Sequence, residues 1–250
     1  MNTGLAAIDP LPLATRLHAL VSVRDVAEAL QAAAAGVDTI DLKDPSDGAL
    51  GGLPLPVIAA IVAALRGWAG DMSVNAISIS ATVGDWPAAA RAAILRRVDR
   101  VAACGVDQVK VGTSMHDVDA AVALIDALAA HARSTGIAIV PVLIADDGIA
   151  SACIAAVRRG GFAAVMLDTA DKRGGSLLQR RPAAELAAWV EALRGPGMRV
   201  GLAGALMPAD IPALRALSPD YAGFRSAVCA GDRRLGLDAG RLAALLVALG

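Results

Sequence analysis

The chain has 250 residues, a formal net charge of −1 and an apolar content of 56%, while aromatic residues make up only 2%. This balanced charge provides no basic surface of the kind that binds nucleic acid, and no basic amphipathic stretch points to a membrane surface. No uncharged apolar window is long enough for a membrane-spanning helix. We therefore expect a globular protein with a core of small aliphatic side chains, which binds neither nucleic acid nor membranes.

The N-terminal residues differ from the rest of the chain. They contain no basic residue before Arg16, and Asp9 and Pro10 interrupt their apolar run, so the pattern is not that of a signal peptide. We expect residues 1–16 to form an arm outside a single domain that covers residues 17–250. The three cysteines are odd in number and far apart, which indicates a reducing, cytoplasmic compartment.

From residue 17 onward, an apolar strand pattern followed by a helical pattern repeats eight times, with a spacing of about thirty residues. In chain order, the expected strands cover residues 17–23, 37–43, 75–83, 106–112, 137–145, 162–167, 198–203 and 220–226. A helix is expected after each strand: over 24–35, after the loop 44–54 to about 68, then to about 105, 136 and 161, over 182–193, after 208, and from 238.

Eight strand–helix units without a linker indicate parallel strands that are joined by crossover helices. Their number and the chain length predict an α/β fold, a single (β/α)8 TIM barrel. A doubly wound open sheet is the alternative, and it usually carries a glycine-rich phosphate loop after its first strand. Residues 21–25 contain no glycine, which favours the barrel.

Lysine is rare in this chain and its positions are informative. Only three of the 23 basic residues are lysines: Lys43, Lys110 and Lys172. Arginine can replace lysine as a charge, but it cannot lose its proton near neutral pH and attack a carbonyl group. The three lysines fall at or just after the ends of the second, fourth and sixth expected strands. Because the carboxyl ends of barrel strands surround the active site, we expect all three on one rim.

Two aspartates accompany these lysines. Asp41 shares a strand face with Lys43, and Asp168 ends the sixth strand four residues before Lys172. Clustered lysines repel one another, so at least one should have a lowered pKa and be nucleophilic, while the aspartates keep the others charged or carry protons. This is the chemistry of amine-dependent aldol and isomerisation reactions on carbonyl compounds. In the alternative interpretation, each lysine only pairs with an aspartate and closes the barrel mouth.

Small residues end the last two strands, where barrels commonly hold phosphate with backbone N–H groups. We expect a substrate phosphate to contact Ala203, Gly204, Arg225 and Ser226, with Arg225 pointing inward because it shares a strand face with Gly223. Alternatively, the glycines there only permit tight turns. The glycine-containing loop 44–52 either covers the site or is an ordinary solvated loop.

Other chemistries find little support in the sequence. The histidines have no metal-ligand spacing, and no nucleophile elbow, P-loop or dinucleotide motif is present, so we expect neither a metal nor a cofactor. Ser78, Ser80 and Thr82 alternate along the third strand and are expected to line the barrel. Asp85, just past that strand, is a further candidate for the site.

Several motifs taken together resemble one family, from about residue 17 to the end of the chain. They are Leu20-Val21-Ser22 with Asp25-Val26-Ala27-Glu28-Ala29, Asp41-Leu42-Lys43-Asp44-Pro45 with Gly48 and Leu50-Gly51, Ser80-Ala81-Thr82-Val83-Gly84-Asp85, Val109-Lys110-Val111-Gly112, Met166-Leu167-Asp168-Thr169-Ala170 with Lys172, Leu202-Ala203-Gly204, and Arg225-Ser226-Ala227-Val228-Cys229 with Gly231-Asp232-Arg233. The chain thus resembles the (5-formylfuran-3-yl)methyl phosphate synthase family, barrel enzymes that make the furan precursor of methanofuran-type C1 carriers.

The resemblance implies a carbon–oxygen lyase that condenses two glyceraldehyde 3-phosphate molecules, with loss of one phosphate and water. It implies that Lys43 forms the Schiff base, that Lys110 is its proton-transfer partner, and that Asp168 and Lys172 complete the site. The expected partner is this small phosphorylated triose, and we also expect a homo-oligomer. Two alternatives stay open: another lysine-dependent aldolase or sugar-phosphate isomerase on the same barrel, and a non-catalytic barrel that binds a phosphorylated metabolite.

Overall fold

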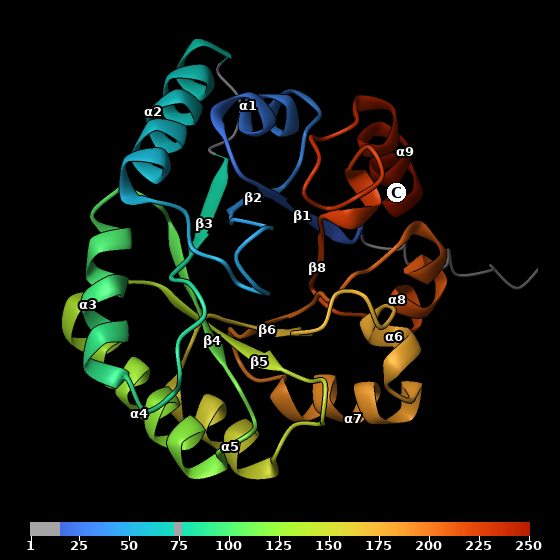
Figure 1. Ribbon diagram of the computed structural model, residues 1–250. Coiled ribbons are helices and arrows are strands. Elements are labelled where there is room, and N and C mark those ends of the chain that lie inside the picture. The colour runs from blue at the N-terminus through green and yellow to red at the C-terminus, as the bar shows by residue number, and fades with distance from the viewer. Residues whose placement is uncertain (1–15, 73–76) are drawn as a thin grey trace, which may run out of the picture.

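The computed structural model describes residues 16–72 and 77–250, in which eight parallel strands close into a barrel inside a ring of helices (Figure 1). Each strand pairs with the next along the chain, and β8 pairs with β1, so the predicted (β/α)8 TIM barrel is confirmed. Most of the expected arm, residues 1–15, and the start of the expected third strand, residues 75–76, lie outside the described residues.

The strands are slightly shorter than the sequence patterns suggest. They are β1 (His18–Val23), β2 (Thr39–Leu42), β3 (Ser78–Thr82), β4 (Gln108–Thr113), β5 (Ile139–Ile144), β6 (Ala164–Asp168), β7 (Arg199–Leu202) and β8 (Tyr221–Phe224).

The helices follow the strands as expected, and short helical segments that the sequence patterns missed accompany the last three units. The α-helices are α1 (Val26–Ala34), α2 (Leu55–Met72), α3 (Arg91–Ala102), α4 (Val118–Thr135), α5 (Ser151–Gly160), α6 (Leu177–Arg180), α7 (Ala183–Leu193), α8 (Ile211–Leu217) and α9 (Ala239–Leu249), and the 3-10 helices are η1 (Pro208–Asp210) and η2 (Ser226–Val228). No helix among the described residues is both long and apolar enough to cross a membrane.

Helix α4 illustrates how local sequence produces these elements. Asp117 caps its first turn by accepting a hydrogen bond from the Ala120 N–H group, and Gly136 ends it in the left-handed region, with φ of 76°. Its buried face includes Leu124 and Ile125, and Leu128 follows them by four and three residues, one turn further along the same face. Burial of each such side chain contributes about 1.5–3 kcal/mol, so the packing face rather than intrinsic propensity holds the helix on the barrel.

The interior of the barrel contains an aromatic side chain, Tyr221, among its buried apolar residues. The Tyr221 ring fits there because Gly201 on the neighbouring strand has no side chain: a Cβ atom at Gly201 would lie 2.2 Å from the ring. The Tyr221 hydroxyl donates a hydrogen bond to the Val165 carbonyl at 2.9 Å, so its polar atom is satisfied inside the core. This packing closes the barrel below the carboxyl ends of the strands.

Candidate active site

The three lysines lie together at the carboxyl ends of the strands. Lys43, Lys110 and Lys172 line a single cavity with Asp41 and Asp168, called here the lysine cavity, which has a volume of about 30 Å³. Lys43 follows β2 directly, Lys110 projects from β4 and Lys172 comes four residues after the end of β6. The structure therefore brings together all five residues that the sequence placed on one rim.

Strand register explains how Asp41 is held. In β2, Asp41 pairs with Ser22 of β1 and with Ser80 of β3, so two hydroxyl groups flank its carboxylate. Ser80 donates a hydrogen bond to Oδ1 at 2.7 Å, and Ser22 donates one to Oδ2 at 3.0 Å. The Lys110 Nζ atom lies 3.2 Å from the same Oδ1. Asp41 is fully buried, so these contacts compensate for the loss of water around its charge.

Asp168 is shared by the two other lysines. Its Oδ2 atom lies 3.7 Å from Lys43 Nζ, while its Oδ1 atom accepts hydrogen bonds from Lys172 Nζ and, at 2.8 Å, from the Thr169 N–H group. Burial alone would raise the pKa of Asp168, but the charges of Lys172 and Lys43 and these hydrogen bonds outweigh it and lower the pKa. Asp168 is therefore a carboxylate at neutral pH.

The Lys43 amine is strongly perturbed by its surroundings. Burial lowers its pKa from 10.5 to about 7; Asp168 opposes this shift, and the charges of Lys172 and Lys110 add to it. Roughly half of the Lys43 amines are then neutral at pH 7, compared with about one in 3,000 for an ordinary lysine. A neutral amine is the form that attacks a carbonyl carbon.

All four candidate phosphate-binding residues, Ala203, Gly204, Arg225 and Ser226, line the same cavity. Gly204 and Ala205 both adopt left-handed backbone conformations, with φ of 108° and 49°. This turn leaves the N–H groups of Gly204 and Ala205 without an acceptor in the described part of the chain. Consecutive N–H groups of this kind form a concave site suited to an anion, and the strained Ala205 conformation is typical of a functional turn.

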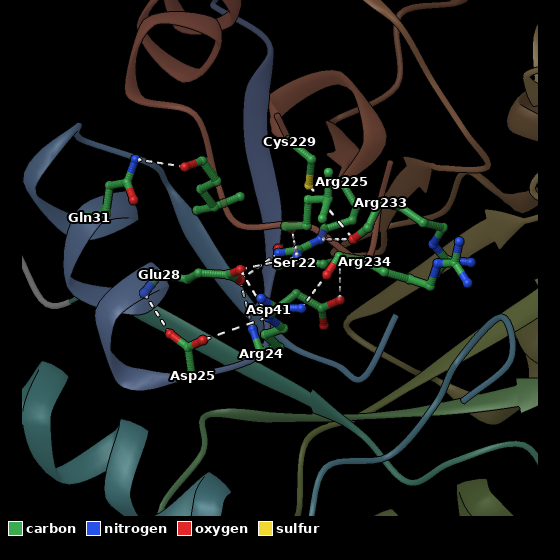
Figure 2. A network of polar contacts seen from close by, with 12 residues as sticks. Ser22, Arg24, Asp25, Glu28, Gln31, Asp41, Arg225, Cys229, Arg233 and Arg234 are labelled. Atoms are coloured by element: carbon green, nitrogen blue, oxygen red, sulfur yellow. Dashed lines mark hydrogen bonds and ion pairs between the residues drawn. The ribbon is translucent and has the colours of Figure 1, made fainter. Parts of the chain in front are cut away.

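Arg225 does not point to an anion as the sequence pattern predicted. Strand β8 ends at Phe224, and Arg225 has φ of −138° and ψ of −61°, so the alternation of side chains stops before it. Figure 2 shows its guanidinium next to Glu28 of α1, to which Nη1 and Nη2 donate hydrogen bonds at 2.5 and 3.1 Å. The remaining donors bind the carbonyl groups of Ser22, Arg233 and Leu235, which uses all five N–H groups.

Arg225 instead fixes the loop that follows η2. It donates hydrogen bonds to the Arg233 and Leu235 carbonyl oxygens, both 2.8 Å long, and these fix the loop on either side of Arg234. The Arg233 side chain reaches the lysine cavity from this loop. Arg233 was named only within the motif Gly231-Asp232-Arg233 and not as a site residue, because an arginine in an irregular loop gives no periodicity signal.

The loop 44–52 is anchored over another part of the barrel mouth. Asp85 accepts a hydrogen bond from the Leu50 N–H group at 3.1 Å, and Thr82 donates one to the Gly51 carbonyl at 2.9 Å. Leu50 is fully buried in the barrel, and a Cβ atom at Gly112 would lie 2.5 Å from it. Asp85 thus holds the loop and does not line the lysine cavity, while Leu50 fills the mouth next to β4.

Within residues 16–72 and 77–250, no group of three or more histidine, cysteine, aspartate or glutamate side chains is arranged to hold a metal ion. The three amines of the lysine cavity are each paired with a carboxylate. Such a cavity can form imines, transfer protons and bind anions.

Eight parallel strands with ionisable residues clustered at their carboxyl ends define this chain as a (β/α)8-barrel protein with its candidate active site in the usual position for that fold. Comparison with known proteins gives the family. The chain belongs to the 4-HFC-P synthase family, which it matches over residues 19–246. Because its curated relatives are named as synthases, the chain is an enzyme.

The relatives cover nearly the whole chain. A provisionally named (5-formylfuran-3-yl)methyl phosphate synthase of Methylorubrum extorquens is 41% identical over 94% of this chain and 92% of its own length. The (5-formylfuran-3-yl)methyl phosphate synthase of Archaeoglobus fulgidus is 33% identical over 87% of this chain and 92% of its own length.

Solved structures show the same fold at much lower identity. Phosphoribosyl anthranilate isomerase from Thermus thermophilus superimposes with a TM-score of 0.62 at 17% identity, over 93% of this chain and 98% of the isomerase. Thiamine phosphate pyrophosphorylase from Pyrococcus furiosus gives a TM-score of 0.59 at 13% identity, over 94% of this chain and 98% of its own. At this level of identity, the two structures show only that the barrel fold is shared.

Proposed function

We propose that this enzyme condenses two molecules of glyceraldehyde 3-phosphate to (5-formylfuran-3-yl)methyl phosphate through a Schiff base on Lys43. The observation that carries the proposal is the Lys43 amine, which burial keeps partly neutral at pH 7, beside the Asp168 carboxylate in a chain of the 4-HFC-P synthase family. The names of the curated relatives supply the product.

The atoms of this reaction balance without an oxidant or reductant. Lys43 attacks the aldehyde carbon of the first triose, one water leaves, and loss of the proton from its second carbon gives an enamine. The second triose loses the proton from its second carbon and the phosphate from its third, which makes that third carbon electrophilic. The enamine carbon then bonds to it. The hydroxyl group of the second triose closes the ring and releases Lys43, and loss of another water gives the furan.

Each buried pair has a defined task in this scheme. Lys110 is held 3.2 Å from Asp41, and this pair moves the proton that converts the imine to the enamine. Lys172 is hydrogen-bonded to Asp168, and its ammonium group assists departure of the phosphate from the second triose. Burial lowers the pKa of Lys43 to about 7, so its amine is partly neutral at neutral pH, as a nucleophile requires.

The phosphate that remains in the product binds at the ends of β7 and β8. The N–H groups of the Gly204 turn and the Ser226 hydroxyl line the lysine cavity there and would donate hydrogen bonds to phosphate oxygens. Arg225 supports this site from behind, because its own N–H groups are used by the protein.

The test is incubation with glyceraldehyde 3-phosphate as the sole substrate, with the furan measured by its ultraviolet absorbance and its mass. Borohydride added during turnover should attach a triose-derived mass to the peptide that contains Lys43. Lys43→Arg keeps the charge but cannot form an imine, so it should abolish turnover. A different aldolase or isomerase would give a product without furan absorbance, and a protein that only binds phosphorylated compounds would turn over nothing.

A further inference from the structure

A much wider space lies beside the lysine cavity. This vestibule, defined here by parts of the loops 45–48, 170–173 and 231–234, has a volume of about 620 Å³, compared with about 30 Å³ for the lysine cavity. Lys172, Ser226 and Arg233 line both spaces, so the two spaces are adjacent. A phosphate released near Lys172 would therefore lie next to the vestibule.

The charges on the vestibule wall are unbalanced. Its two carboxylates are already paired: Asp232 contacts Arg234 at 2.9 Å, and Asp171 contacts Arg180 at 3.0 Å. Arg233 and Arg173 form no ion pair with any residue in 16–72 and 77–250. The vestibule thus presents surplus positive charge beside the lysine cavity, which is the arrangement that binds phosphate groups.

Of the two cations, Arg233 and Arg173, it is Arg233 that the surrounding protein holds in place. It is half-buried, and its carbonyl oxygen is bonded to Arg225, which is itself anchored on the buried Glu28. Exposed Arg173, by contrast, lies at the outer rim. Burial lowers the pKa of Lys172, Asp168 opposes this, and the charge of Arg233 adds to the lowering. A half-buried guanidinium this near to another cation is stabilised when an anion lies between them.

We infer that Arg233 binds the phosphate of the second triose, the one that the reaction expels, and guides it into the vestibule as inorganic phosphate. In this step the C3–O bond of the triose breaks, its electron pair goes to the phosphate oxygen, and the proton at the second carbon passes to a base in the lysine cavity. The inference rests on the proposed function, since it assigns a place to the second substrate of that reaction. It gives the enzyme two separate phosphate sites, one at Gly204 and one at Arg233.

The first experiment measures binding of inorganic phosphate without turnover, by equilibrium dialysis of the intact protein. The wild type should bind two phosphates per chain, and Arg233→Gln should bind one. Arg234→Gln is the matched control, because this neighbouring guanidinium is already paired with Asp232, and it should still bind two. Arg233→Lys restores a charge without the planar fork and should recover part of the lost affinity. If Arg233→Gln still binds two phosphates, or if Arg234→Gln loses one as well, the assignment is wrong.

The second experiment separates the two trioses. Borohydride trapping of the first triose on Lys43 should be unchanged in Arg233→Gln, while kcat/KM for furan formation falls roughly 10- to 100-fold, the value of one charge-assisted hydrogen bond. Equal losses of trapping and turnover would show a general structural defect and overturn the assignment. If the wild type forms neither imine nor furan, the proposed function fails, and the phosphate dialysis still decides whether the Arg233 site exists.

Discussion

The pKa of Lys43 should move in opposite directions when its two charged neighbours are removed one at a time. Lys172→Met deletes a cation that lowers this pKa, so the pKa should rise above about 7. Asp168→Asn deletes the carboxylate that opposes the lowering, so the pKa should fall. Burial, the largest cause, stays in place in both variants, so the two shifts report the charges alone.

The distances suggest that the shifts are large enough to measure. Asp168 Oδ2 lies 3.7 Å from Lys43 Nζ, where two unit charges interact by about 4 kcal/mol at an effective dielectric constant of about 20. A third of that energy corresponds to about one pKa unit. If the Lys172→Met shift reaches about one unit, the neutral fraction of Lys43 at pH 7 falls from about one half to about one tenth.

The assay follows acetylation of Lys43 by a small neutral reagent between pH 5 and 10, with peptide mass spectrometry as the readout and no substrate present. Asp232→Asn, a change on the vestibule wall, serves as the control and should leave the profile of Lys43 unchanged. Shifts in the same direction for both variants, or no shift in either, would refute an electrostatic origin. Circular dichroism of each variant at each pH confirms that the fold is retained.

Four further changes test other parts of the site. Glu28→Gln leaves Arg225 buried without its counter-ion and should lower the free energy of unfolding by about 3–5 kcal/mol in urea titrations. Gly204→Val should raise KM at least tenfold in the furan assay, because φ is 108° and a Cβ atom would lie 2.9 Å from Thr169 Oγ1. Lys43→Met should abolish turnover yet raise the free energy of unfolding by roughly 1 kcal/mol, since it removes a costly buried amine. Dialysis against EDTA should leave furan formation intact; a loss that zinc or magnesium restores would contradict an amine-only mechanism.

The fold was predictable because its signals are local and repeated. Eight apolar strand patterns, each followed by a helical pattern, leave few topologies for parallel strands, and the observed order follows the chain. The misses are short elements: α6 has four residues, and η1 and η2 have three each. Segments of this length have too few positions for a periodic pattern, and tertiary contacts determine whether they form.

The lysine cavity was predictable because side chains at strand ends follow the period of two and the barrel brings those ends together. The same rule failed for Arg225, since β8 ends one residue before it. Its partner Glu28 is 197 positions away in the sequence, so no local pattern could indicate the pair. The position of Arg233 depends on the same long-range contact, because Arg225 donates the hydrogen bond that fixes the Arg233 loop. A local pattern therefore could not indicate it either.

The charges in the lysine cavity favour one order of binding, in which the first triose forms its imine on Lys43 before a phosphate occupies the site at Arg233. Three lysines face two carboxylates in the lysine cavity, and Arg233 adds a further positive charge at its edge. Loss of a proton from one lysine reduces this surplus, and the Lys43 pKa of about 7 allows Lys43 to lose its proton at neutral pH. A phosphate dianion that arrives first at Arg233 would favour the protonated amines around it and so remove the nucleophile. Imine formation on Lys43 before the vestibule is occupied avoids this competition. Inorganic phosphate should therefore slow imine trapping in the wild type and have less effect in Arg233→Gln, as stopped-flow borohydride quenching can measure.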